Sequence, residues 1–365
     1  MRKLVTEIAP IALGLVIASS ASAQDAPPES TNSPTNSPTN SASNNAAPGE
    51  ITPALDSAIA RALAYLDAQQ QSDGSWAGGR FGKNVAITSL ACLAMMGDGN
   101  TPSRGEHARA IRKGLEFVLD NAAENGLIAA EAANGPMYGH GFATLFLGEA
   151  YGMTAGGGDT ALSARLHEAL VKAVRLIERT QNDEGGWRYN PVPYDADVSV
   201  TICQVMALRS ARNAGIEVKK EVIDKAVDYI RRCQNVDGGF KYQLETGSSA
   251  WPRSAAGVAS LFYAGIYEDQ AIDKGVGYLH RVAKPGAPRA SRAHYFYGHY
   301  YAVQAMFLAG GEDWESWWPA IRRELLESQL EDGSWEDRTV GPAYATAMSL
   351  IILQMPKRYL PIFQK

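Results

Sequence analysis

The chain has 365 residues, a formal net charge of −5 and three cysteines. This mildly acidic balance gives no reason to expect nucleic acid or an anionic membrane surface as a partner. Cys92, Cys203 and Cys233 lie in apolar stretches, which favours buried thiols over a disulfide framework.

Residues 1–23 have the pattern of a secretory signal peptide. A short basic start precedes an apolar run from Ile8 to Ile17, and Ala21 to Ala23 forms a small-x-small cleavage site. The apolar run is too short to span a membrane, and no later segment has the length and apolar character of a transmembrane helix. We therefore expect an exported protein, periplasmic or secreted, that is cleaved near Ala23.

Residues 24–49 have the composition of a disordered linker. Pro, Ser, Thr and Asn dominate this stretch, and a short motif repeats outright between Thr31 and Asn40. Such a composition buries too little apolar surface to offset the entropy cost of ordering the chain. The folded domain is therefore expected at residues 50–365.

Six helix pairs can be placed in that domain. The first helix of each pair is amphipathic, with apolar residues at helical spacing such as Leu166, Leu170 and Val174. The second helix is apolar on nearly every side, which predicts burial on every side. The amphipathic helices are predicted at 56–70, 107–121, 163–180, 218–233, 269–282 and 314–328, and the apolar helices near Asn84, Tyr138, Asp197, Pro252, Phe296 and Ala343.

One kind of turn recurs between the two helices of a pair. Its copies begin with Gln, contain Gly and end in an aromatic residue: Gln71–Trp76, Gln181–Trp187, Gln234–Phe240 and Gln329–Trp335. Repeats about fifty residues apart indicate stacked units. The last apolar helix is as apolar as the middle ones, whereas an open solenoid needs polar capping repeats. The prediction is an all-α fold, an (α/α)6 toroid with an apolar inner ring and an amphipathic outer ring.

These turns resemble the QW-type repeats of the squalene-cyclase and protein-prenyltransferase β-subunit superfamily. The resemblance covers most of residues 50–365 and implies the α/α-toroid fold. It also implies that the Gln and the aromatic residue of each turn brace successive helix pairs, which is a structural role.

Asp195 and Asp197 are the candidate catalytic residues that this resemblance implies. The cyclases carry an acidic Asp-x-Asp-Asp motif whose central Asp protonates an alkene, and Asp197 matches that central position. Val198 stands where the last Asp is expected, which removes a neighbour that would hold the proton. The alternative interpretation is that Asp197 caps the apolar helix that follows it, a position that Asp favours. Both interpretations stay open.

The prenyltransferase branch implies a zinc ion held by an Asp, a Cys and a distant His. Asp197 falls at the Asp position, but Ser199 replaces the Cys, and Gly298 replaces the His with His299 beside it. Without a thiolate this set makes no closed zinc site. We therefore expect neither a metal nor another cofactor.

Aromatic and cationic residues gather near the starts of the apolar helices. They have the chemistry to line a cavity and stabilise a carbocation, stack on a sugar or hold a lipid tail. Core packing is the alternative interpretation. The candidate lining residues are Tyr138, His140, Trp251, Arg253, Tyr295, Tyr297, His299, Tyr300 and Tyr344.

Three functions remain open. The first is an exported cyclase-like or prenyl-transferring enzyme that acts on, or binds, an isoprenoid or other apolar ligand. The second is a non-catalytic module that binds a lipid, glycan or peptide. The third is a carbohydrate-active barrel, which needs two carboxylates roughly 5–9.5 Å apart across the cavity. Glu131 or Glu149 would have to supply the second carboxylate.

Overall fold

The computed structural model describes residues 49–130, 135–154, 159–245, 247–286 and 293–364. The predicted signal peptide and all of the predicted linker except Gly49 lie outside these residues. Within them the chain forms twelve α-helices and three short 3-10 turns, with no named strand. No helix in this described part combines the length and the hydropathy needed to cross a membrane.

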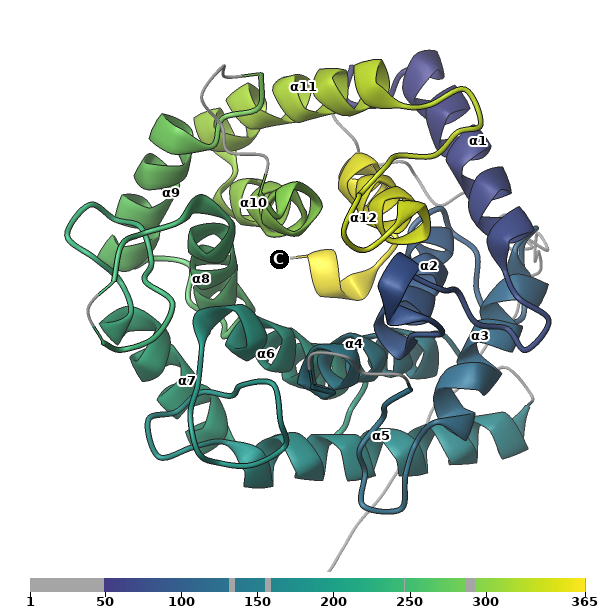
Figure 1. The fold of residues 1–365 in the computed structure, drawn as a ribbon, viewed down its shortest axis with the longest axis horizontal. Helices are drawn as coiled ribbons and strands as arrows, with labels where there is room; N and C mark the ends of the chain where they lie inside the picture. Colours follow the sequence, from purple (N-terminus) through teal and green to yellow (C-terminus); the bar gives the residue numbers. More distant parts are fainter. Residues whose placement is uncertain (1–48, 131–134, 155–158, 246, 287–292, 365) are drawn as a thin grey trace, which may run out of the picture. The chain divides into compact units, whose positions relative to one another are not determined.

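The helices alternate between an outer and an inner ring (Figure 1). The outer ring contains α1 (Pro53–Gln69), α3 (Ala108–Asp120), α5 (Thr160–Thr180), α7 (Lys220–Arg232), α9 (Gln270–Val282) and α11 (Gly311–Ser328). The inner ring contains α2 (Val85–Met96), α4 (Met137–Thr154), α6 (Val198–Asn213), α8 (Trp251–Tyr263), α10 (Tyr295–Ala309) and α12 (Pro342–Leu353). Each inner helix packs against the next, and α12 packs against α2, so the ring is closed. The predicted toroid is confirmed.

Hydrophobic patterning explains which helix lies in which ring. In α7 the buried residues Val222, Ala226, Tyr229 and Ile230 form one stripe, and charged residues cover the other face. In α12 almost every residue is buried, because an inner helix has neighbours on both sides, an outer helix behind it and the ring interior in front.

The turns between paired helices are held by the side-chain amide of a Gln. Gln181 Nε2 donates to Gly185 O at 2.9 Å within the turn and to Val222 O at 2.8 Å in the next outer helix. Gly185 has a φ of +102°, and a Cβ at this position would lie 2.2 Å from Lys225 O. The turn therefore requires glycine, both for its backbone angle and for the close approach.

The first copy of this turn corrects one prediction. Gln70, and not Gln71, makes the bridging bonds, to Gly74 O at 3.0 Å and to Ala110 O at 2.8 Å. The bridging Gln must stand four residues before the glycine of the turn, and Gln70 meets that condition. In the last copy Gln329 Nε2 reaches Ala58 O of α1 at 2.9 Å, which ties the end of the outer ring to its beginning.

In three of these turns the aromatic residue is a Trp that is bound at both its main chain and its ring, and in the Gln234–Phe240 turn Phe240 is bound at its main chain, where its N donates to Ser254 Oγ at 2.8 Å. Trp187 Nε1 donates to Ile177 O at 2.8 Å, and Trp187 N donates to Thr201 Oγ1 at 3.1 Å. Equivalent pairs of bonds hold Trp76 and Trp335 to their own helix pairs. Each turn thus joins the outer helix before it to the inner helix after it.

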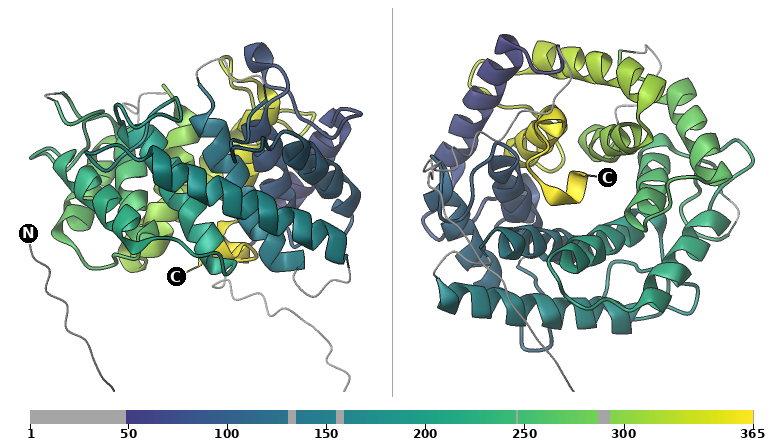
Figure 2. Two further views of the ribbon diagram at one scale, coloured as in Figure 1. Left: turned by 90° about the horizontal axis from the view of Figure 1, so that it is seen from below. Right: turned by 180° about the vertical axis from the view of Figure 1, so that it is seen from behind.

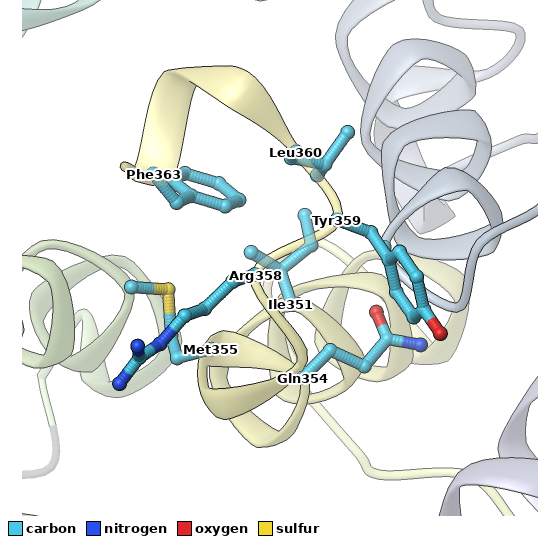
Figure 3. Close-up of a pocket in the computed structure, with 8 residues that line it drawn as sticks. Ile351, Gln354, Met355, Arg358, Tyr359, Leu360 and Phe363 are labelled. Carbon is cyan, nitrogen blue, oxygen red and sulfur yellow. The ribbon is translucent and has the colours of Figure 1, made fainter. Parts of the chain in front are cut away.

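The C-terminal segment lies inside the ring and occupies the mouth where the inner helices end (Figures 1 and 2). It contains the 3-10 turns η2 (Met355–Lys357) and η3 (Pro361–Phe363). Leu360, Ile362 and Phe363 are buried, and Figure 3 shows how this segment folds back beside Ile351 of α12. The main-chain N–H of Ile362 donates to Glu149 Oε2 of α4 at 3.2 Å.

Candidate functional site

A cavity of about 920 Å³ lies at the other mouth, where the inner helices begin. Its wall is mainly apolar and aromatic, and no Asp or Glu is among the described residues that line it. The apolar part of the wall includes Phe81, Val85, Ile87, Leu90, Phe142, Val340 and Met348. Five tyrosines contribute their phenol rings: Tyr138, Tyr189, Tyr242, Tyr297 and Tyr344. The other polar residues are Asn84, Asn190, Ser199, Arg253, His294 and Thr339. The arrangement suits a ligand that is largely hydrocarbon and carries a few polar groups.

Four of the predicted lining residues lie on this wall: Tyr138, Arg253, Tyr297 and Tyr344. Tyr297 on α10 spans to the start of α6, where its hydroxyl donates to Ser199 O at 3.0 Å. Arg253 is held by the chain itself, since its Nε donates to Phe240 O at 3.0 Å. These side chains therefore present fixed surfaces to the cavity.

His140 does not line the cavity, which corrects the prediction. It is fully buried between helices, where Nδ1 accepts from Ile128 N at 3.2 Å and Nε2 lies 3.3 Å from Ala173 O. Since Nδ1 accepts, the ring proton is on Nε2 and the imidazole is neutral. Burial lowers the pKa of His140 to about 4. His140 accepts from Ile128 N as Thr201 accepts from Trp187 N in the Gln181–Trp187 turn, so its role is structural.

Trp251, Tyr295 and His299 also lie away from the cavity. The ring centroid of His299 is 4.8 Å from that of Trp251, 4.5 Å from Tyr295 and 6.1 Å from Trp317 of the outer helix α11. A Cβ at Gly298 would lie 2.2 Å from the Trp251 ring. This cluster packs α8 and α10 against the outer ring, so the expectation of cavity lining is corrected for all three.

Tyr300 lies below the cavity instead of on its wall. Its ring centroid is 6.1 Å from that of Phe142, which lines the cavity, and 6.5 Å from that of Phe363 in the C-terminal segment. It is fully buried. Tyr300 therefore fills the layer between the cavity and the C-terminal segment.

Asp197 caps α6 and is completely buried. Its Oδ1 accepts from Val200 N at 2.8 Å, and its Oδ2 accepts from the Tyr242 hydroxyl at 3.1 Å. Burial raises the pKa of Asp197 to about 6, and the bonds from Val200 N and Tyr242 oppose that rise. The carboxyl group lies one side chain behind the cavity wall.

Asp195 lies closer to solvent than Asp197 and forms an ion pair with Arg188. The Arg188 Nε lies 3.8 Å from Asp197 Oδ2, so one guanidinium neighbours both carboxylates. Asp195 is therefore positioned to hold Arg188, and not to reach the cavity.

Tyr189 and Tyr242 are the site residues that the sequence prediction missed. Both line the cavity, and their hydroxyl oxygens are 2.5 Å apart. They lie on loops, where helical spacing does not predict the direction in which a side chain points. A signal did exist in the repeats: Tyr189 follows Trp187 by two residues, and Tyr242 follows Phe240 by two.

No group of three His, Cys, Asp or Glu side chains in the described part of the chain is arranged to hold a metal ion. Cys203, which lies near the zinc-like positions, is buried with its Sγ 3.3 Å from the Tyr301 hydroxyl. Burial raises the pKa of the Cys203 thiol to about 12. This thiol is therefore protonated and packed, and not prepared for coordination.

The two carboxylates needed for a glycosidase are not assembled around the cavity in the described residues. Glu149 is buried near the opposite mouth, where its Oε1 accepts from Ser210 Oγ at 2.8 Å and its Oε2 accepts from Ile362 N. Burial raises the pKa of Glu149 to about 7. Glu131 lies outside the described residues.

Comparison with known proteins relates this toroid to the cyclases. Residues 163–294 match the family described as the squalene-hopene cyclase C-terminal domain. The resemblance to the squalene-cyclase superfamily is confirmed. Residues 163–294 are thus similar to a squalene-cyclase domain, and the fold is an α/α toroid. No curated protein matches it.

Solved structures with the same fold include two different kinds of enzyme. The type II terpene cyclase MstE from Scytonema has a TM-score of 0.57 at 16% identity, over 85% of this chain and 99% of that one. A variant of it, solved with the substrate geranylgeranyl dihydroxybenzoate, has a TM-score of 0.58 at 16% identity, over 84% and 98% of the two chains. An inactive variant of the alpha-1,6-mannanase GH76A of Salegentibacter sp. HEL1_6, in complex with alpha-1,6-mannotriose, has a TM-score of 0.61 at 8% identity, over 84% and 99%. At these identities the likeness is one of fold alone.

Proposed function

We propose that this toroid is an exported protein that holds an isoprenoid or other largely apolar ligand in its central cavity. The observation that supports this most directly is the composition of the cavity wall, which is mainly aliphatic and aromatic, with no carboxylate among the described lining residues. A volume of about 920 Å³ is near the upper end of the roughly 300–1,000 Å³ typical of small-molecule sites. Burial of the hydrocarbon would provide most of the affinity.

The glycan alternative has weaker support. Cleavage of a glycosidic bond requires two carboxylates that face each other across the substrate. In the described residues, Asp195 is paired with Arg188, Asp197 lies behind Tyr242, and Glu149 is buried beside the C-terminal segment. The mannanase likeness therefore supports the shared architecture and not this reaction.

A second candidate function is cyclase-like catalysis with Asp197 as the general acid. The raised pKa of Asp197, about 6, favours a carboxyl group that keeps its proton in mildly acidic conditions. Two features oppose it. Asp197 is fully buried behind Tyr242, and a carboxyl group whose pKa is raised by burial is a weaker acid toward an alkene.

The cavity can be tested by filling it. Ala86 lines the cavity at the start of α2, whereas Ala60 is exposed on α1. We expect native mass spectrometry with added geranylgeraniol to show one bound molecule for the wild type and for Ala60→Trp, and none for Ala86→Trp. Affinity should rise roughly tenfold or more for each added five-carbon unit, because each buried CH2 contributes about 0.8 kcal/mol. Equal binding by both tryptophan variants, or no binding of any chain length by the wild type, would contradict the proposal.

Catalysis is tested separately with Asp197→Asn, which keeps a capping residue at the start of α6. Lipid extracted from the wild type and from this variant should contain the same molecule if the protein only binds. A ligand that differs chemically between the two preparations would establish the second candidate function.

A further inference from the structure

The cavity wall beside α6 carries a row of three hydrogen-bonding groups: Asp197, Tyr242 and Tyr189. The Tyr242 hydroxyl is 3.1 Å from Asp197 Oδ2, and the Tyr189 hydroxyl is 2.5 Å from that of Tyr242. Asp197 is buried, whereas both phenols line the cavity. The row thus leads from a buried carboxyl group to the ligand space.

The backbone fixes the position of this row. Val198 N donates to Tyr242 O at 3.1 Å, and Gln243 Nε2 donates to Ala196 O at 3.1 Å, so the loop that carries Tyr242 is tied to the start of α6. The Arg188 guanidinium carbon lies 5.1 Å from the centre of the Tyr189 ring and 5.8 Å from that of Tyr242. The two phenols are therefore held in place before a ligand arrives, which lowers the entropy cost of binding.

The number of protons shared by these three groups decides the direction in which the hydrogen bonds between them run. An ionised carboxylate only accepts hydrogen bonds, and a phenol has one proton to donate. When Asp197 is ionised, Tyr242 donates its proton to Asp197, and Tyr189 donates its own to Tyr242. The oxygen of Tyr189 then offers the cavity lone pairs only. A ligand group that meets Tyr189 must supply a donor.

The surroundings restrict what that donor can be. The wall around it is mainly apolar and includes Tyr138, whose ring centroid lies 6.1 Å from that of Tyr189. Burying an ammonium there would cost far more than burying a neutral group. A hydroxyl is a neutral group that supplies one donor at the end of a hydrocarbon, whereas an ionised carboxylate only accepts.

We infer that Tyr189 is the anchor for the hydroxyl group of the ligand, so that the cavity selects a long-chain or polycyclic isoprenoid alcohol over its ether. This inference rests on the proposed function and names the class of ligand. Tyr242 and Asp197 act through Tyr189 and are positioning residues.

The selectivity depends on pH through Asp197. The titratable groups around it are Arg188 and Asp195 of the preceding loop, Tyr189 and Tyr242, Tyr138 of α4, Cys203 of α6, Tyr229 of α7 and Tyr297 of α10. Arg188 and Asp195 are paired with each other, and the remaining groups are phenols and a thiol. Because burial raises the pKa of Asp197 to about 6, the carboxyl is ionised above that pH. Below it, Asp197 can donate and the row can reverse, so Tyr189 can then donate to an ether.

The test compares geranylgeraniol with its methyl ether by titration calorimetry. At pH 8 we expect the wild type to prefer the alcohol by roughly tenfold. Tyr189→Phe should remove this preference and leave the affinity for the ether unchanged. Tyr242→Phe should strengthen binding of the ether, because the proton of Tyr189 is then free to point into the cavity. Tyr194→Phe, on the same loop with 87% of the residue exposed, is the control and should match the wild type.

The outcomes separate this inference from the proposed function. If neither compound binds the wild type, the proposed function fails. If both bind with equal affinity at pH 8, or if Tyr189→Phe keeps the preference, only the hydroxyl anchor is overturned. A preference for the alcohol that shrinks at pH 5 in the wild type but not in Asp197→Asn supports the direction assigned to the row. A preference that stays the same from pH 8 to pH 5 in the wild type overturns that direction.

Discussion

The two mouths of the toroid are built in different ways. The mouth at the starts of the inner helices is framed by repeated turns, each held by a Gln such as Gln181, and it contains the cavity. The mouth at the other end is occupied by one segment that occurs once in the chain (Figure 2). Its Leu360, Ile362 and Phe363 are buried. A repeat architecture thus provides the ring, and a non-repeated segment makes its two ends unequal.

This difference determines where chemistry can occur. The repeated turns expose loop positions such as Tyr189 and Tyr242 to the cavity, so side chains at these positions form part of the site. The C-terminal segment buries apolar side chains at the other end of the ring. The mouth that contains the cavity is therefore available to bind a ligand, whereas the C-terminal segment at the other mouth stabilises the ring.

The largest predicted effect concerns the C-terminal segment. Ile362→Ala and Phe363→Ala should each lower the free energy of unfolding by about 2–5 kcal/mol, since each removes a buried apolar side chain and leaves a space that the ring cannot fill. Urea unfolding followed by circular dichroism measures this. Tyr194→Ala, an exposed aromatic residue, should change stability by less than about 0.5 kcal/mol. A similar small change in Ile362→Ala would show that the segment does not stabilise the ring.

A smaller effect is a pH dependence of the free energy of unfolding that comes from Glu149, which binds the same segment. Its pKa is raised from 4.5 to about 7 by burial, so the folded state binds a proton more tightly than the unfolded state. Its contribution is most favourable below pH 4.5 and falls by roughly 3 kcal/mol as the pH rises through 7. Glu149→Gln should therefore be more stable than the wild type at pH 8, with the gap shrinking toward pH 5.

The control for this prediction is Glu124→Gln, because the side chain of Glu124 is 93% exposed. Its stability should track that of the wild type at every pH. His140 acts in the opposite direction, since its pKa is lowered to about 4 and it destabilises the fold as the pH falls below about 6.5. Comparison with Glu149→Gln cancels that contribution because His140 is present in both proteins. A pH-independent gap would contradict the role given to Glu149.

Much of the fold was predictable because the helices obey local rules. The inner helices were expected near Asn84 and Asp197, and α2 and α6 begin one residue after these caps. The C-terminal segment was not predicted. It has neither a helical period nor a repeat, and its place inside the ring depends on long-range contacts such as that between Ile362 and Glu149.

The site was less predictable than the fold. Tyr138, Tyr297 and Tyr344 lie near the starts of inner helices, a position that predicts their place on the cavity wall. The same rule failed for His140 and His299, because an inner helix that is apolar all round gives no sign of which face points to the ring axis. That face can be identified only from the packing of neighbouring helices.

The smallest effect tests how the repeated turns are built. Gln70 donates to Gly74 O and to Ala110 O, whereas the side chain of the adjacent Gln71 makes neither bond. Gln70→Ala should lower the free energy of unfolding by about 1–2 kcal/mol, because two partly buried carbonyl groups lose their donor. Gln71→Ala should cost less than about 0.5 kcal/mol. The same urea titration measures both variants. If Gln71→Ala cost more than Gln70→Ala, the bridging Gln would stand three residues before the glycine. The assignment of the bridging bonds to Gln70 would then be wrong.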